Sequence, residues 1–206
     1  MPLGDSITDG FGRPGGYRTG LWQRLVQRDH DKIDFVGSRS SGPETLEDKD
    51  NEGHPGWCVA GACGGDSTMN INTNIRTWVR ASQPDIVSIH LGTNDLKWGA
   101  SAATVAYRLD VLVNTILQEK PNTQIVLIQI IPMGTANKEW AEYVRLIPKV
   151  AARYHADGFK ITVADLSAAL NYPRDYADPL HPSARGYAKM AAKLYPAIAS
   201  TYAAAH

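Results

Sequence analysis

Three runs of apolar, largely β-branched residues constrain the fold of this chain more than any other feature. They cover residues 85–91, 123–131 and 160–165. Apolar runs of this length without polar alternation are typical of strands that are buried on both faces. Segments with helical periodicity separate them, so strand and helix alternate. This order predicts a parallel sheet between two layers of helices, because parallel strands need crossover connections. The expected helices are 17–28, 70–81, 102–119, 138–156 and 183–202.

Two shorter segments complete the expected sheet. Residues 33–37 predict a fourth strand, and Met1 to Leu3 predict the end of a fifth. The resulting fold class is α/β, a three-layer α/β/α sandwich around a parallel five-stranded sheet, in a single domain that spans residues 1–206. Pro148 falls inside the fourth expected helix and predicts a kink or a restart there. Residues 40–68 lack periodicity, which indicates a functional or disordered segment.

Charge and hydropathy restrict the partners of the chain. Lys plus Arg and Asp plus Glu both total 21, and no run of like charge occurs, so neither nucleic acid nor an anionic membrane is an expected partner. The longest apolar stretch, 125–131, is far too short to span a bilayer. The equal numbers of positive and negative residues fit a small neutral substrate better than a charged partner. No signal peptide is visible, and because only three residues precede Gly4, we expect that an upstream segment is missing.

The chain contains two cysteines, Cys58 and Cys63, which flank Val-Ala-Gly-Ala. A glycine-rich loop can turn back sharply enough to close a small ring, so we predict a disulfide between them, and with it a secreted protein. The alternative is two small buried side chains. The four-ligand set of a zinc site is absent from the sequence around this pair.

Polar motifs follow the expected strands at the points where the strands end. Ser6 follows the first strand, 92–95 follows the strand that ends at residue 91, Asp178 and His181 lie beyond the last strand, and 52–57 lies in the long segment after residues 33–37. Ligands of open parallel α/β sheets bind outside the carboxyl ends of the strands. Four loops are therefore expected to converge on one site.

A serine nucleophile with its base is the chemistry that these motifs support. Asp178 and His181 are three residues apart, so the carboxylate can hold the imidazole tautomer whose Nε2 accepts the proton of Ser6. The Ser6 and Gly56 backbone N–H groups and the Asn94 amide are candidate oxyanion donors. The alternative roles are an N-cap for Ser6, a helix cap for Asp178 and ordinary turn residues for the other two.

The residues just described resemble the motif blocks of the SGNH hydrolases, the GDSL lipase/esterase superfamily. The blocks fall in order at Gly4-Asp5-Ser6, at Gly56, at residues 92–95 and at residues 178–181. Residues 1–10, 52–57 and 181–187 are most similar to carbohydrate esterase family three, the acetyl xylan esterases. The resemblance implies a flavodoxin-like α/β/α sandwich, extracellular action and removal of acetyl groups from plant cell-wall polysaccharide. It also implies a bound calcium near the active-site loops, where Asp66 is a candidate ligand.

The expected reaction is attack by Ser6 on an acetyl ester, with an acetyl-serine intermediate and no cofactor required for catalysis. Aromatic rings stack well on sugars, so Trp57, Trp98 and Tyr17 are candidate substrate contacts, with His54 lining the site and His90 packed in the core. Polar loops around the site favour a short acyl group. We expect a monomer that acts on an acetylated polysaccharide or oligosaccharide. The alternatives are a lysophospholipase or thioesterase of the same superfamily and a catalytically silent carbohydrate-binding domain.

Overall fold

The computed structural model describes residues 1–29, 33–134 and 137–204 and contains a six-stranded sheet in the order β2-β3-β1-β4-β5-β6. Five strands are mutually parallel, and β2 pairs antiparallel with β3 at the edge. The parallel sheet of the prediction is therefore confirmed, with one additional short strand. The strands are β1 Pro2–Gly4, β2 Arg39–Ser40, β3 Asp50–Gly53, β4 Ile86–His90, β5 Gln124–Gln129 and β6 Ile161–Asp165.

The strand predicted at residues 33–37 is wrong, and β3 takes its place beside β1. Backbone N–H groups of the 33–37 region donate to side chains instead of to a neighbouring strand. The Phe35 N–H donates to the Asp48 carboxylate, and the Ser38 N–H donates to the Glu52 carboxylate at 2.7 Å. The sequence of β3 is Asp-Asn-Glu-Gly, so it carries no apolar residue from which a buried strand could be recognised.

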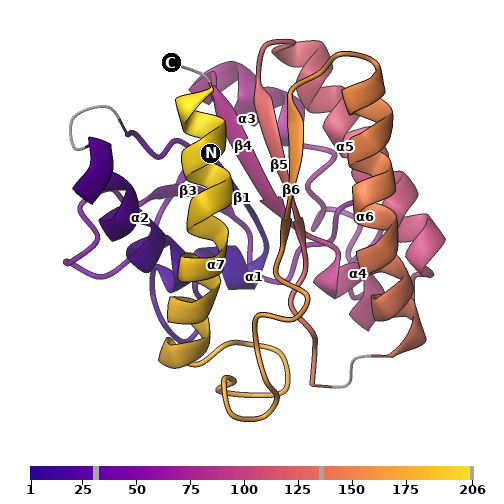
Figure 1. Ribbon diagram of the computed structural model, residues 1–206. Coiled ribbons are helices and arrows are strands. Elements are labelled where there is room, and N and C mark those ends of the chain that lie inside the picture. Colours follow the sequence, from indigo (N-terminus) through magenta and orange to yellow (C-terminus); the bar gives the residue numbers. More distant parts are fainter. Residues whose placement is uncertain (30–32, 135–136, 205–206) are drawn as a thin grey trace.

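Helices cover both faces of the sheet (Figure 1). Helices α2 and α7 pack on each other over one face, while α5 and α6 cover the other with α3 beside α5. Strand β5 shows why both faces need cover: Ile125 and Leu127 enter the core under α5 and α6, and Val126 and Ile128 enter the core under α2 and α7. The helices are α1 Ser6–Asp9, α2 Gly16–Asp29, α3 Ile75–Ser82, α4 Thr93–Lys97, α5 Ala102–Glu119, α6 Lys138–Ala156 and α7 Ala184–Ala203.

Helix α6 runs through Pro148 as one continuous helix, so the restart, one of the two predicted outcomes, does not occur. A proline at this position cannot pair with the carbonyl four residues earlier, which belongs to Val144. The side chain of Gln129, at the end of β5, donates to that carbonyl at 2.8 Å. A neighbouring strand therefore satisfies the acceptor that the proline leaves open, and the helix continues to Ala156.

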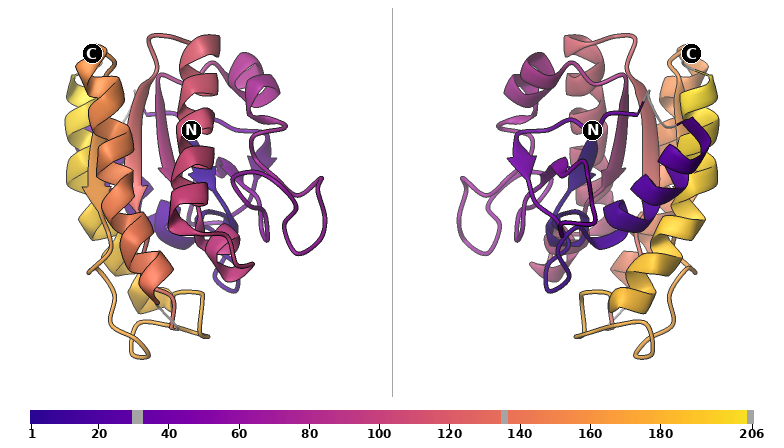
Figure 2. Two further views of the ribbon diagram at one scale, coloured as in Figure 1. Left: turned by 90° about the vertical axis from the view of Figure 1, so that its right-hand side faces the viewer. Right: turned by 90° about the vertical axis from the view of Figure 1, so that its left-hand side faces the viewer.

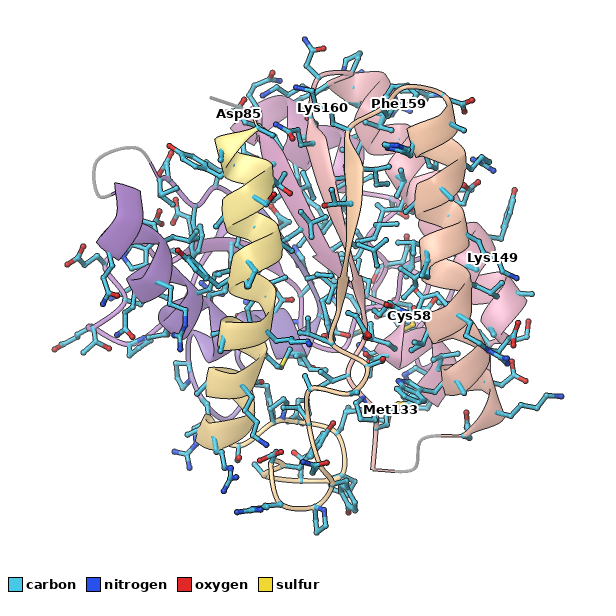
Figure 3. All side chains as sticks on the ribbon, viewed as in Figure 1. Cys58, Asp85, Met133, Lys149, Phe159 and Lys160 are labelled. Carbon is cyan, nitrogen blue, oxygen red and sulfur yellow. A yellow bond between two sulfur atoms is a disulfide. The ribbon has the colours of Figure 1, made fainter. Side chains whose placement is uncertain are left out.

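The carboxyl ends of the strands lie together at one end of the molecule. Asp85 and Lys160, just before β4 and β6, lie at the top of Figure 3, whereas Cys58 and Met133 lie towards the bottom. Strand register brings the ends of β3, β1 and β4 side by side, because Gly4 is paired with Gly53 on one side and with His90 on the other. Figure 2 shows the connection from β6 to α7 extending beyond this end of the sheet. The loops that carry the candidate site residues meet here.

Candidate active site

Ser6 lies on a sharp turn between β1 and α1. A Cβ on Gly4 would lie 2.0 Å from Thr8 Oγ1 and 2.8 Å from the His90 carbonyl oxygen, so only glycine fits where the chain turns. Asp5 is the N-cap of α1, and its Oδ1 accepts the Ile7 N–H at 2.9 Å. The alternative role of Ser6 as an N-cap is therefore wrong. Its hydroxyl is left free for another partner.

That partner is His181. Ser6 Oγ lies 3.0 Å from His181 Nε2, across 175 positions of sequence. On the other side of the ring, His181 Nδ1 lies 2.8 Å from Asp178 Oδ2. A carboxylate only accepts, so Nδ1–H donates to Asp178, and Nε2 is left with the lone pair that accepts the serine proton. The structure brings these three predicted residues together in the order that proton transfer requires.

Asp178 is held by its own turn. Its Oδ1 accepts the backbone N–H groups of Leu180 and His181, each at 2.7 Å, and Ser183, not Asp178, caps α7. Partial burial works to raise the pKa of the Asp178 carboxyl, but the His181 and Leu180 N–H groups and the imidazole outweigh it and lower that pKa below its usual value. Asp178 is therefore ionised at neutral pH and can steady an imidazolium.

The candidate oxyanion donors lie on neighbouring turns. Asn94, in α4, donates one amide N–H to the Trp57 carbonyl at 2.9 Å, and a carboxamide has a second N–H to offer. Gly56 has φ +82°, and within residues 1–29, 33–134 and 137–204 its N–H has no hydrogen-bond acceptor. The Ser6 N–H opens α1 and so lacks an intrahelical acceptor. Each of the three residues therefore has an N–H available as a candidate oxyanion donor.

Asp95 ties the motif of α4 to the loop that follows Gly56, a role that sequence reasoning missed. Its Oδ2 accepts the Val59 N–H and its Oδ1 accepts an N–H of Arg108, both at 2.8 Å. Burial raises the pKa of the Asp95 carboxyl, while the Val59 N–H and the Arg108 guanidinium lower it in part. A sequence motif marks the residue, but the two partners lie 36 and 13 positions away and carry no local signal.

The predicted substrate contacts differ in how exposed their side chains are. Tyr17 is only 1% exposed and its hydroxyl bonds with Thr8, so it cannot be the exposed ring that the prediction requires. His54 is 7% exposed and is paired with Glu52, so it does not line an open surface. Trp57 is half-buried against His54. Trp98 is 58% exposed, and the Lys97 ammonium lies 5.6 Å from its ring centroid, which leaves Trp98 as the candidate sugar platform.

Phe11 also borders the site, although the sequence did not single it out. It is 54% exposed, its ring centroid lies 4.7 Å from that of His181, and its N–H donates to the Ser6 carbonyl at 2.9 Å. The only sequence signal was its position five residues after the serine. His181 also borders an open hollow of about 450 Å³, lined by Leu96, Lys97, Met133, Asn137 and residues 178–181. His90 is fully buried as predicted, and burial lowers its pKa to about 4.

The predicted disulfide between Cys58 and Cys63 is present, with the Cα atoms 5.5 Å apart. Cys63 Sγ lies 3.0 Å from the Gly56 carbonyl oxygen, so the bridge braces the turn that carries a candidate oxyanion donor. Calcium at Asp66 stays a prediction; Oδ1 of this carboxylate accepts the N–H and the hydroxyl of Thr68. In the described part of the chain no three His, Cys, Asp or Glu residues gather in a metal-binding group.

Comparison with known proteins finds similar esterases. A carbohydrate esterase of family 3 from Clostridium thermocellum superposes with a TM-score of 0.84 at 34% identity, covering 100% of this chain and 98% of that one. An acetyl esterase mutant with an acetate ion gives 0.84 at 26% identity, with 100% and 98% covered. A multidomain esterase of Ruminococcus flavefaciens is 30% identical over 92% of this chain, which spans 27% of the length of that relative.

No helix among the described residues is both long and apolar enough to cross a membrane. The model of the GDSL-like lipase/acylhydrolase family matches residues 3–189 and so includes every block from Gly4-Asp5-Ser6 to His181. The chain therefore belongs to the GDSL-like lipase/acylhydrolase family.

Proposed function

We propose that this chain is a serine esterase that removes acetyl groups from a polysaccharide, with acetylated xylan as the substrate class. The observation that carries the proposal is the hydrogen-bonded series from Ser6 Oγ to His181 Nε2 at 3.0 Å and from His181 Nδ1 to Asp178 at 2.8 Å. A serine becomes a useful nucleophile when a base takes its proton and a third group orients that base.

In the proposed mechanism Ser6 Oγ attacks the ester carbonyl carbon while His181 Nε2 takes the hydroxyl proton. The carbonyl oxygen becomes an oxyanion that accepts hydrogen bonds from the N–H groups of Ser6 and Gly56 and from the Asn94 amide. The tetrahedral intermediate collapses as His181 returns the proton to the sugar oxygen, which leaves acetyl-serine. Water, deprotonated by His181, attacks that ester, and acetate and free Ser6 are released.

Three observations support an acetylated carbohydrate as the substrate. Similar structures are named as a family 3 carbohydrate esterase and as an acetyl esterase with acetate. The exposed Trp98 offers a stacking face and directly follows Lys97, which lines the hollow at His181. The Cys58–Cys63 disulfide suits an oxidising environment, which supports action outside the cell. We further propose that the enzyme works as a monomer and needs no cofactor for catalysis.

The first test measures acetate release from acetylated xylan beside hydrolysis of an aryl acetate. We expect both from the wild type, and a loss of roughly 10³-fold or more in kcat from Ser6→Ala, since losing a nucleophile removes the covalent route. Ser88→Ala is the matched control: Ser88 is buried in β4 away from the site, and that variant should keep its activity. Normal hydrolysis by Ser6→Ala would contradict the mechanism.

Acyl-chain preference and covalent labelling separate the remaining alternatives. A lysophospholipase or thioesterase would turn over eight-carbon acyl esters faster than two-carbon esters, whereas we expect the reverse. A catalytically silent binding domain would form no adduct with an organophosphonate in the folded state. We expect one adduct, on Ser6, that the Ser6→Ala variant does not form.

A further inference from the structure

A buried carboxylate and a buried imidazole lie next to the active site without a part in the mechanism above. Glu52, in β3, is 0% exposed, and His54, just beyond β3, is 7% exposed. His54 Nε2 lies 2.5 Å from Glu52 Oε1, and the same carboxylate accepts the hydroxyl of Ser38 at 2.6 Å. The carboxylate only accepts, so the imidazole must donate through Nε2–H. Burying such a pair costs solvation free energy, and this cost suggests a functional reason for keeping both groups.

Two indole rings fix the plane of this imidazole. Trp78, in α3, stacks on His54 with centroids 4.4 Å apart and planes inclined by only 10°. Trp57 packs against the His54 ring with centroids 4.5 Å apart. With its edge bonded to Glu52 and aromatic rings packed against it, the His54 side chain has a single orientation.

The backbone of His54 carries that orientation into the active site. Its N–H donates to the Gly4 carbonyl at 2.9 Å, beside the nucleophile turn, and its carbonyl accepts the Trp57 N–H at 3.2 Å. The turn closed in this way contains Gly56, whose N–H is free of acceptors within the described residues. The Trp57 carbonyl in turn accepts the Asn94 amide at 2.9 Å. Two of the three candidate oxyanion donors therefore depend on one turn, and His54 anchors that turn.

We propose that Glu52 and His54 are positioning residues that aim the Gly56 N–H and the Asn94 amide at the oxyanion, an inference that rests on the proposed esterase function. Neither side chain touches the substrate. Both act through the backbone of residues 54–57. Because the oxyanion forms only along the reaction path, misplaced donors lower kcat and leave KM for a small ester unchanged.

The test compares variants that break the Glu52–His54 bond with one that does not. His54→Phe keeps a ring for the stack with Trp78 and loses the donor, and Glu52→Leu removes the acceptor. Ser38→Ala is the control, because it removes a different hydrogen bond of the same carboxylate. Aryl acetate hydrolysis is normalised to the number of sites that an organophosphonate labels at its endpoint. We expect kcat to fall roughly tenfold to a hundredfold in the first two variants, with KM within about twofold, and the control to stay near wild type.

A double-mutant cycle with Asn94→Ala separates positioning from general structural support. If His54 acts through the oxyanion donors, the double variant His54→Phe/Asn94→Ala loses clearly less kcat than the product of the two single losses. Losses that multiply would overturn the inference, as would an unchanged kcat per labelled site or a rise in KM alone. Ser6→Ala, assayed alongside, distinguishes failure of the esterase mechanism from failure of the positioning role. If Ser6→Ala remains active, the esterase mechanism is wrong. If Ser6→Ala is inactive and His54→Phe is fully active, only the positioning role is refuted.

Discussion

Asp5, the residue directly before the proposed nucleophile Ser6, has a carboxyl group in an environment that disfavours its charge. It is 1% exposed, and burial raises its pKa from 3.8 to about 7, with the Asp95 carboxylate adding to the rise and the Ile7 N–H opposing it. Below that pH the group is a neutral acid that caps α1. The turn that presents Ser6 therefore contains an acid whose ionisation works against the folded state.

The shift makes stability depend on pH in a defined direction. Unfolded Asp5 loses its proton near pH 4, while folded Asp5 keeps it to about pH 7, so stability is highest below pH 4 for this group and declines as pH rises to about 7. One unit of pKa difference corresponds to about 1.4 kcal/mol, so the rise from 3.8 to about 7 corresponds to a decline of about 4 kcal/mol. Asp5→Asn imitates the neutral acid. Urea unfolding between pH 4 and 8 should show a flatter profile for this variant, and identical slopes would contradict the assignment.

Trp98 supports a second prediction at the residue scale, one that concerns the substrate. Its indole is 58% exposed and directly follows Lys97, which lines the hollow next to His181. Trp98→Ala should therefore raise KM for acetylated xylan by roughly twofold to tenfold, the loss of about 0.5–1.5 kcal/mol of stacking. KM for an aryl acetate should not change. Tyr107→Ala is the control, an aromatic ring that is 69% exposed on α5 outside the site. Equal effects on both substrates would place Trp98 in the fold and not in sugar binding.

Among the elements, the connection from β6 to α7 depends on one buried carboxylate. Asp175 is 0% exposed, accepts the Asn171 N–H at 2.8 Å, and forms ion pairs with Lys189 and Arg185 of α7. Its backbone carbonyl accepts the Ser183 N–H at 2.9 Å. The Lys189 ammonium and the Asn171 N–H lower the pKa of Asp175, so these bonds persist to below its usual pKa. The loop that carries Asp178 and His181 is thus fastened to the start of α7.

Asp175→Asn should therefore loosen the loop and misplace the base. The variant loses the charge that both cations of α7 share, so we expect a lower melting temperature together with a drop in kcat. Arg185→Gln is the milder comparison, because it leaves the Lys189 pair in place. The measurements are thermal unfolding and aryl acetate kinetics at a temperature where both variants are folded. An unchanged kcat in folded Asp175→Asn would show that the loop keeps its shape without this anchor.

Elements with a hydrophobic signal could be predicted from the sequence, and those without one could not. The bounds of α5 and α6 were predicted to the residue, because long periodic helices with clear ends depend on local pattern. Strand β3 was missed because it buries Asn51 and Glu52, whose partners lie elsewhere in the chain. In the site, Asp178 and His181 are close in sequence and were found by spacing. The anchors Glu52, Asp95 and Asp175 acquire their roles only from tertiary contacts.

For the molecule as a whole, the cores and the active-site end are held by different means. Two apolar clusters, one on each face of the sheet, stabilise the strands and the long helices. The turns at the carboxyl ends rely on side-chain hydrogen bonds to backbone groups, such as Asp95 to the Val59 N–H, and on the Cys58–Cys63 bridge. Local stability varies within a fold, and regions with few apolar contacts open first. The site end should therefore lose its order before the sheet does.

Removing the disulfide tests this division. The bridge spans five positions, and the chain-entropy model assigns so small a ring about 2 kcal/mol, which for a protein of this size lowers the melting temperature by roughly 4–8 °C. Because Cys63 contacts the carbonyl of Gly56, the Cys58→Ser/Cys63→Ser variant should lose esterase activity at a lower temperature than it loses far-UV circular dichroism, whereas the two transitions of the wild type should lie closer together. If both transitions of the variant fell together by the same amount, the turn that contains Gly56 and the sheet would form one cooperative unit. The bridge would then stabilise the whole domain and not this turn in particular.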